Sequence, residues 1–108
     1  MFVHCVGNAA LDLALDAMDE VDGDLPLFGL RWTLEHAGLD PTERNLEQAK
    51  RLGVVVSTQQ PMGWTIGKSF KRMWGDELGS NWMPNKTWMD AGVVVKGGSD
   101  VAPINPMI

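Results

Sequence analysis

Three side chains that can bind a metal ion stand at the ends of separate apolar stretches of the sequence. His4 lies near the end of the first stretch, His36 ends the second, and Asp100 follows a run of valines and glycines. Two imidazoles and one carboxylate are ligand types of hydrolytic zinc sites, in which three protein ligands leave a coordination position for water. The residue types therefore point to metal-assisted hydrolysis, provided that the fold brings them together.

Each of these residues, taken alone, has a more ordinary explanation. A lone histidine in an apolar strand is usually a hydrogen-bonded core residue, and an aspartate after glycines usually forms a turn. Three such residues at three separate strand ends would be an unusual accident, so their coincidence carries the weight. We therefore interpret His4, His36 and Asp100 as members of one site.

The elements that must position these residues follow from the pattern of apolar side chains. We predict strands at 2–6, 30–36, 54–58 and 93–95, with helices at 9–21, 41–52 and 84–92. The glycine-rich segment 62–83 is expected to be irregular, apart from a short helix at 68–74. Repeated strand and helix units with nearly continuous apolar strands predict an α/β fold with a parallel sheet. Four such units are half of a (βα)8 barrel, whose reactive groups sit at the C-terminal ends of the strands.

The expected helix ends rest on capping residues. Asn8 is placed to cap the first helix, and Asp40, with Glu43 three residues later, is placed to cap the second. Gly53 is expected to end the second helix, because glycine readily adopts the left-handed conformation that terminates helices.

Composition and charge exclude several classes of partner. The 108 residues include 9 basic and 14 acidic side chains, a net charge of -5, without the basic cluster that a nucleic acid requires. No stretch approaches the roughly 20 apolar residues of a membrane span. The single cysteine, Cys5, fits a reducing compartment, and we expect a cytoplasmic location. Because Cys5 and His4 are neighbours on a strand, they point to opposite faces, and we expect Cys5 to pack in the core.

Four segments resemble the later strands of the amidohydrolase superfamily. They are HCVGNAALDLALDA from His4, RWTLEHA from Arg31, LGVVVSTQQP from Leu52, and WMDAGVVVKGGSD from Trp88. Within that superfamily they are most similar to the branch containing N-substituted formamide deformylase, and the resemblance covers nearly the whole chain. It implies a partial (βα)8 TIM barrel in which residues 1–108 supply strands five to eight, the C-terminal half of the barrel.

The resemblance also implies roles for the three candidate residues. His4 corresponds to the histidine ligand of strand five, His36 to that of strand six, and Asp100 to the aspartate of strand eight. Asp100 would be catalytic as well as a metal ligand, taking a proton from the attacking water and delivering it to the departing amine. The implied cofactor is a divalent metal, with zinc the expected ion and one or two ions in the parent enzyme. The implied substrate is a small amide or formamide.

Several positions depart from the family pattern. The family usually has Asp and Arg where this chain has Asn8 and Ala9. Lys96 shares strand parity with Asp100 and would point into the barrel unless the following glycines form a bulge, which is the arrangement we favour. The first-strand histidine pair and the strand-four bridging residue of the family have no counterpart, so the metal site within this chain is expected to be incomplete.

The remaining candidates concern the substrate pocket and a second interpretation of the whole chain. Trp64 and Trp74 are expected to line a substrate pocket and Trp88 to pack, while Glu35 is expected to face away from the site. The alternative to a hydrolase is a non-catalytic half-barrel, a structural unit that associates with itself through exposed strand edges.

Overall fold

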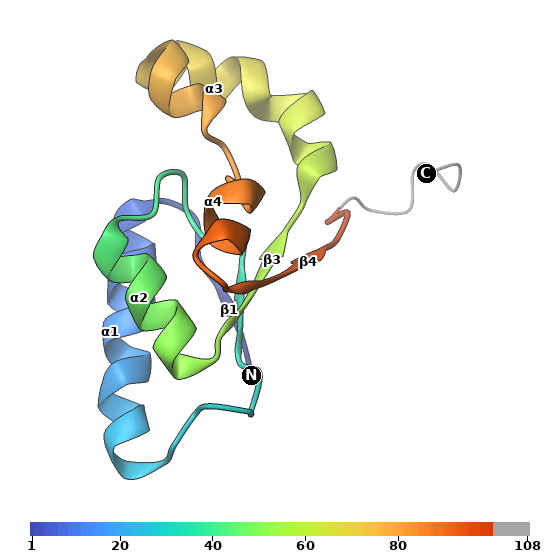
Figure 1. The fold of residues 1–108 in the computed structure, drawn as a ribbon. Helices are drawn as coiled ribbons and strands as arrows, with labels where there is room; N and C mark the ends of the chain where they lie inside the picture. Colours follow the sequence, from blue (N-terminus) through green and yellow to red (C-terminus); the bar gives the residue numbers. More distant parts are fainter. Residues whose placement is uncertain (101–108) are drawn as a thin grey trace.

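The computed structural model describes residues 1–100, with the exception of the Trp64 side chain, and shows a parallel sheet with helices between its strands. The strands are β1 (Phe2–His4), β2 (Thr33–Glu35), β3 (Val55–Thr58) and β4 (Val94–Gly97), and they lie side by side in that order. The helices are α1 (Asn8–Asp24), α2 (Glu43–Leu52), α3 (Gln60–Ser80) and α4 (Asn85–Asp90) (Figure 1). The predicted α/β class and parallel sheet are confirmed, and the arrangement is compatible with part of a barrel.

The strand register sorts the side chains of the sheet into two faces. Val3, Leu34, Val56 and Val95 form one lateral row and join the hydrophobic core. The next row, His4, Glu35, Ser57 and Lys96, projects to the opposite face, because successive residues on a strand alternate in direction. We call this second face the inner face, since a closed barrel would enclose it.

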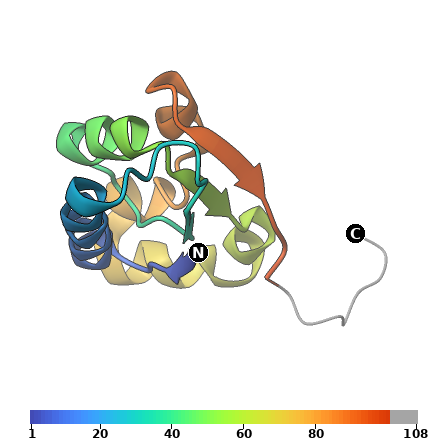
Figure 2. The same cartoon turned by 90° about the horizontal axis from the view of Figure 1, so that it is seen from below.

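The core lies between the helices and the face of the sheet opposite to the inner face. Leu11 and Leu15 of α1, Leu52 of α2 and Trp88 of α4 are each at most 1 % exposed. The predicted packing role of Trp88 is confirmed. α1 and α2 lie side by side, whereas α3 lies beyond the C-terminal ends of the strands (Figures 1 and 2). Among the described residues, no helix combines the length and apolar character needed to cross a membrane.

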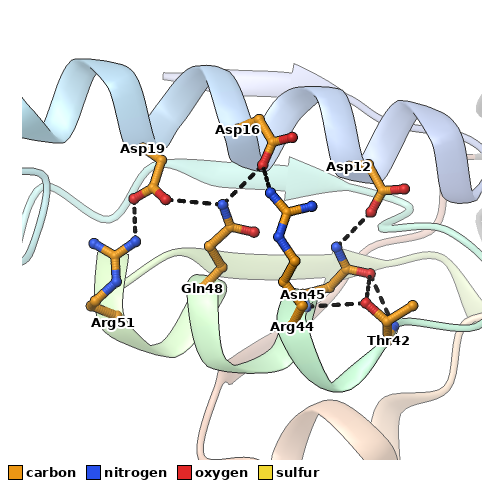
Figure 3. Close-up of polar contacts among 8 residues, drawn as sticks. All are labelled: Asp12, Asp16, Asp19, Thr42, Arg44, Asn45, Gln48 and Arg51. Carbon is orange, nitrogen blue, oxygen red and sulfur yellow. Dashed lines mark hydrogen bonds and ion pairs between the residues drawn. The ribbon is translucent and has the colours of Figure 1, made fainter.

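A row of polar contacts joins α1 to α2 (Figure 3). Gln48 Nε2 donates to Asp16 Oδ1 and to Asp19 Oδ2, each at 3.0 Å, and Asn45 Nδ2 donates to Asp12 Oδ1 at 2.8 Å. Arginines complete the row, with Arg44 paired to Asp16 and Arg51 paired to Asp19. The three aspartates recur at helical spacing on one side of α1, so they bind the neighbouring helix as a set.

The helix ends differ from the predicted ones at two of three positions. Gly53 ends α2 with a φ of 66°, as predicted, and its N–H donates to the carbonyls of the last turn. The N-cap of α2 is Thr42 instead of Asp40, because Thr42 and Asn45 exchange hydrogen bonds in a capping box. Asn8 is the first residue of α1 and forms no cap there.

The expectation that segment 62–83 is irregular was wrong. α3 fills most of it as two helical arms joined at Gly75, whose φ and ψ of 82° and 170° are not helical. Of its glycines, Gly75 interrupts the helix and Gly79 allows the two arms to pack closely. A Cβ at Gly79 would lie 2.7 Å from the Lys71 Cα, a distance that no larger residue tolerates without movement of the backbone.

We predict that the hydrogen bonds to Asp19 make the free energy of unfolding depend on pH. Hydrogen bonds from Arg51 and Gln48 hold the pKa of the Asp19 carboxyl below its usual value. A lowered pKa in the folded chain stabilises it above the unfolded pKa, and this stabilisation is lost as the pH falls through the folded pKa. The free energy of unfolding, measured with urea at a series of pH values below neutrality, should therefore decrease less with falling pH in Asp19→Asn than in the native chain. The control is Asp24→Asn, since Asp24 is exposed and forms no ion pair within residues 1–100. An equal decrease in the free energy of unfolding of the native chain and of Asp19→Asn as the pH falls would contradict the prediction.

Candidate functional site

The three predicted site residues are linked by two side-chain contacts at the C-terminal edge of the sheet. The rings of His4 and His36 meet edge to face, with centroids 4.7 Å apart and planes at 79°. His36 Nε2 lies 3.6 Å from Asp100 Oδ2. The fold thus brings together residues from the ends of β1, β2 and β4 that are up to 96 positions apart.

His36 reaches this position because strand alternation ends with β2. Glu35 pairs in register with His4 and therefore shares the inner face, so regular alternation would send His36 to the helix-covered side. His36 has a φ of 74° instead, which redirects the chain while its N–H donates to Ser57 O at 2.8 Å. The expectation that Glu35 faces away from the site was wrong, and the reason is this left-handed residue.

The segment after His36 is held by its neighbours. Ala37 and Gly38 also have positive φ values, 57° and 73°, and the Gly38 N–H donates to Cys5 O at 3.3 Å. The side-chain oxygen of Asn8 accepts from the N–H groups of Leu39 at 3.0 Å and Asp40 at 3.2 Å. Asn8 therefore anchors the loop that leaves His36, where the sequence suggested only a helix cap.

Glu35 and Lys96 form a second polar group on the inner face. Lys96 Nζ lies 3.6 Å from Glu35 Oε1 and 4.4 Å from the centre of the Phe2 ring. Gln59 Nε2 donates to Glu35 Oε2 at 2.8 Å and to Ser57 Oγ at 3.1 Å. The bulge that we favoured after Lys96 is absent, because β4 pairs with β3 residue by residue through Gly97.

Burial and free hydrogen-bonding capacity differ among the three site residues. His36 is 4 % exposed, and its buried Nδ1 has no hydrogen-bond partner among residues 1–100. The Asp100 side chain is 54 % exposed, and His4 is exposed as well. Exposure of a carboxylate and an imidazole beside a buried histidine suits a site that is open to solvent from one side.

The donor set fits a divalent metal in its chemistry. Two imidazoles and a carboxylate match the ligand types of hydrolytic zinc sites, and within the described part of the chain the buried Nδ1 of His36 has no hydrogen-bond partner. Within residues 1–100, however, no three His, Cys, Asp or Glu side chains are grouped closely enough to hold a metal ion. The three candidate residues are therefore in contact as pairs, without forming a complete metal-binding group within residues 1–100.

The other predicted residues have separate outcomes. Trp74 is 38 % exposed, stacks on Phe70 with ring centres 4.7 Å apart, and lines a hollow of about 430 Å³ together with Asp40 and Glu77. Trp64 falls in α3, and its side chain lies outside the described part of the structure. Cys5 is fully buried in the core as predicted, and burial raises the pKa of its thiol to about 11.

Comparison with known proteins adds one decisive observation. A family model described as the amidohydrolase family matches residues 1–108, the whole chain. The chain belongs to the amidohydrolase family. No curated protein and no solved structure matches this amidohydrolase chain.

Sequence reasoning missed the contribution of Glu35, Gln59 and Lys96 to the inner face of this amidohydrolase. The parity of Lys96 with Asp100 was the available signal, and a regular β4 would have been the better interpretation. Glu35 carried no such signal, because nothing in the neighbouring sequence indicates that His36 adopts a left-handed backbone conformation. For Gln59, the two hydroxyl residues before it mark the end of β3 but not the direction of its side chain.

We predict that Asn8→Ala loosens the loop that follows His36. Removal of the acceptor leaves the Leu39 and Asp40 N–H groups without a protein partner, and we expect their hydrogen exchange to accelerate about tenfold, in line with the loss of one hydrogen bond. The amide of Val54, which donates to Ala49 O, should exchange at an unchanged rate. The matched control is Asn85→Ala, because the buried Asn85 Oδ1 accepts no hydrogen bond from any residue that the structure describes. Unchanged exchange at both loop amides would show that Asn8 does not anchor the loop.

Proposed function

We propose that the chain is part of a metal-dependent hydrolase that cuts a non-peptide carbon–nitrogen bond, of the amide or formamide type, with an activated water molecule. The observation that carries the proposal is the chain of contacts from His4 through His36 to Asp100 in a member of the amidohydrolase family. The four parallel strands then correspond to strands five to eight of the barrel, in the branch that contains N-substituted formamide deformylase. Such a protein acts in the cytoplasm on a small amide substrate.

The proposed metal ligands are His4, His36 and Asp100, with further ligands supplied by the rest of the barrel. A divalent ion, zinc in our proposal, lowers the pKa of water and polarises a carbonyl when it is bound. Family membership supports this cofactor, because amidohydrolases generally use divalent metals. One or two ions are compatible with three ligands from this half of the site.

Asp100 is the proposed catalytic residue because its carboxylate combines exposure with a fixed partner. It lies 3.6 Å from the buried His36 and is reached by solvent, so it can accept a proton without leaving its place. In the proposed reaction the water oxygen bonds to the carbonyl carbon and its proton passes to Asp100. The carbon–nitrogen bond then breaks, and Asp100 returns the proton to the departing amine nitrogen.

We expect His36→Ala and Asp100→Asn to remove activity by different routes. In the enzyme that carries this segment, His36→Ala should lower zinc content, and Asp100→Asn should lower kcat/KM for an N-substituted formamide by about 100-fold or more. Metal analysis and initial rates at neutral pH measure both effects. Asp90→Asn is the matched control, because Asp90 is exposed and paired only with Lys86 within residues 1–100. Full zinc content and full rates in both site variants would refute the proposal.

A second candidate function is a non-catalytic half-barrel that associates with another copy of itself. Its support is that β1 and β4 each pair on one side only within the described residues, so both edges of the sheet are open. Phe2 and Val94, which lie on the inner face at these edges, are 68 % and 63 % exposed, while Thr33 and Val55 in the same row are 3 % and 8 % exposed. A second copy would offer a parallel edge of the same kind to each open strand.

This second candidate predicts a dimer of the 11.9 kDa chain in sedimentation velocity. Phe2→Glu and Val94→Glu should shift the population to monomer, because each would place a charge inside the joined sheets. Leu13→Glu should leave the dimer intact, since Leu13 is 72 % exposed on α1. A native chain that sediments as a monomer at every concentration would rule this candidate out.

A further inference from the structure

The hollow that Trp74 lines, about 430 Å³ in volume, lies between the second arm of α3 and the loop that follows His36. Its wall consists of Asp40, Trp74, Glu77, Leu78, Ser80 and Asn81. A volume of this size suits a small organic molecule better than a single metal ion. No basic side chain belongs to this wall within the described part of the chain, so the side chains that line the hollow carry negative charge only.

Two carboxylates from different elements give the hollow its charge. Asp40 belongs to the loop, where the Asn8 side chain accepts from its backbone N–H at 3.2 Å and Asn81 Nδ2 donates to its Oδ1 at 2.7 Å. Glu77 lies on the second arm of α3. Neither carboxylate forms an ion pair with any of the residues that the structure describes. The negative charge of the hollow is therefore not neutralised by a side chain within residues 1–100.

The indole of Trp74 forms the aromatic part of this wall. Its ring stacks on Phe70 with centroids 4.7 Å apart and planes at 19°, and Phe70 in turn contacts the Trp82 ring at 4.2 Å. This stack fixes the position of the indole, while 38 % of Trp74 remains exposed. An aromatic ring attracts a cation through its π electrons, and tryptophan is the most effective side chain for this contact. The indole and the carboxylates therefore favour a ligand of the same charge.

Contacts within the chain hold both sides of the hollow in place. On the side of the loop, the hydrogen bonds of Asn8 and Asn81 fix Asp40. On the side of α3, Gly79 packs so closely on the first arm that a Cβ would lie 2.7 Å from the Lys71 Cα. A site that is formed before the ligand arrives loses less conformational entropy on binding.

We propose that this hollow binds the ammonium group of a small primary alkylamine. An alkylamine is protonated at neutral pH, as a lysine side chain is, and its three N–H groups donate to carboxylate oxygens in charge-assisted hydrogen bonds. Asp40 Oδ2 and the Glu77 carboxylate are the acceptors, because Asp40 Oδ1 already accepts from Asn81. Leu78 and the Trp74 ring offer apolar surface to the alkyl group. None of the three site residues lines the hollow, so the inference does not rest on the proposed hydrolase.

The test is a titration of the chain of residues 1–108, labelled with ¹⁵N, at neutral pH. The probe is n-butylammonium chloride, and n-butanol is its neutral counterpart with the same alkyl chain. We expect n-butylammonium to shift the indole N–H signal of Trp74 and the backbone N–H signals of Glu77 and Asn81. The alcohol should bind about tenfold more weakly or not at all, because the charge-assisted hydrogen bonds are lost. Added sodium chloride should weaken the binding of the ammonium ion only.

Substitutions test which side chains recognise the ammonium group. Glu77→Gln and Asp40→Asn keep the size of each side chain and should each weaken n-butylammonium binding by about tenfold. Trp74→Leu should weaken it by about threefold, the effect of one cation–π contact at an exposed site. Asp76→Asn is the matched control, because Asp76 precedes Glu77 on the same arm, is exposed and does not line the hollow. The comparison of the ammonium ion with the alcohol uses the native chain, so it holds even if a variant fails to fold.

Four outcomes would overturn the inference. Equal affinity for n-butylammonium and n-butanol would show that charge is not recognised, and unchanged affinity in both carboxylate variants would place the binding elsewhere. Tetramethylammonium that binds as tightly as n-butylammonium would show that the N–H groups are not recognised. Binding of Mg²⁺ at the same signals without binding of n-butylammonium would identify an inorganic cation as the ligand. The titration involves no turnover, so its result is independent of the proposed hydrolysis.

Discussion

The chain leaves β2 through three consecutive residues with positive φ, His36 at 74°, Ala37 at 57° and Gly38 at 73°. For residues other than glycine, this conformation costs about 1 kcal/mol or more, so the surroundings must stabilise it. Hydrogen bonds to the carbonyls of Ser57 and Cys5 hold the turn from two neighbouring strands. If His36 continued the strand, its ring would enter the helix-covered core, and the contacts with His4 and Asp100 would both be lost. The candidate site therefore depends on this turn.

One face of the sheet contributes to the stability of the fold, and the other carries the polar groups that could take part in chemistry. On one face, the row from Val3 to Val95 packs against helices, and the aspartates of α1 bind α2 through arginine and amide side chains. On the other face, the row from His4 to Lys96 carries imidazole, carboxylate, hydroxyl and ammonium groups. Because the register is regular across all four strands, the four polar residues lie directly beside one another near the C-terminal edge of the sheet. Parallel α/β folds place their reactive groups at this edge.

The parts of the fold that could be predicted from sequence are those with a local physical cause. Runs of β-branched residues marked β3 and β4, and Gly53 ended α2 because glycine tolerates a left-handed conformation. The short helix predicted at 68–74 lies within α3, but the rest of α3 was missed because its glycines were interpreted as helix breakers, whereas Gly63 and Gly79 allow Trp82 and the Lys71 backbone to approach.

The candidate site was predictable in its members but not in its surroundings. His4, His36 and Asp100 follow from residue type and from position at strand ends. The inward direction of Glu35 does not, since it depends on the sign of φ at His36, a tertiary property. The role of Asn8 was equally hidden, because its acceptor serves a loop 31 residues away instead of its own helix.

The most direct test of the shared site uses the fact that the chain contains only two histidines, His4 and His36. Their imidazole nitrogens can be followed by NMR in a chain labelled with ¹⁵N while zinc is added. If the two residues belong to one metal site, the signals of both rings should shift together and saturate at the same zinc concentration, and Asp100→Asn should weaken both responses. Independent titration of the two rings, or the absence of any change in His36, would contradict the account.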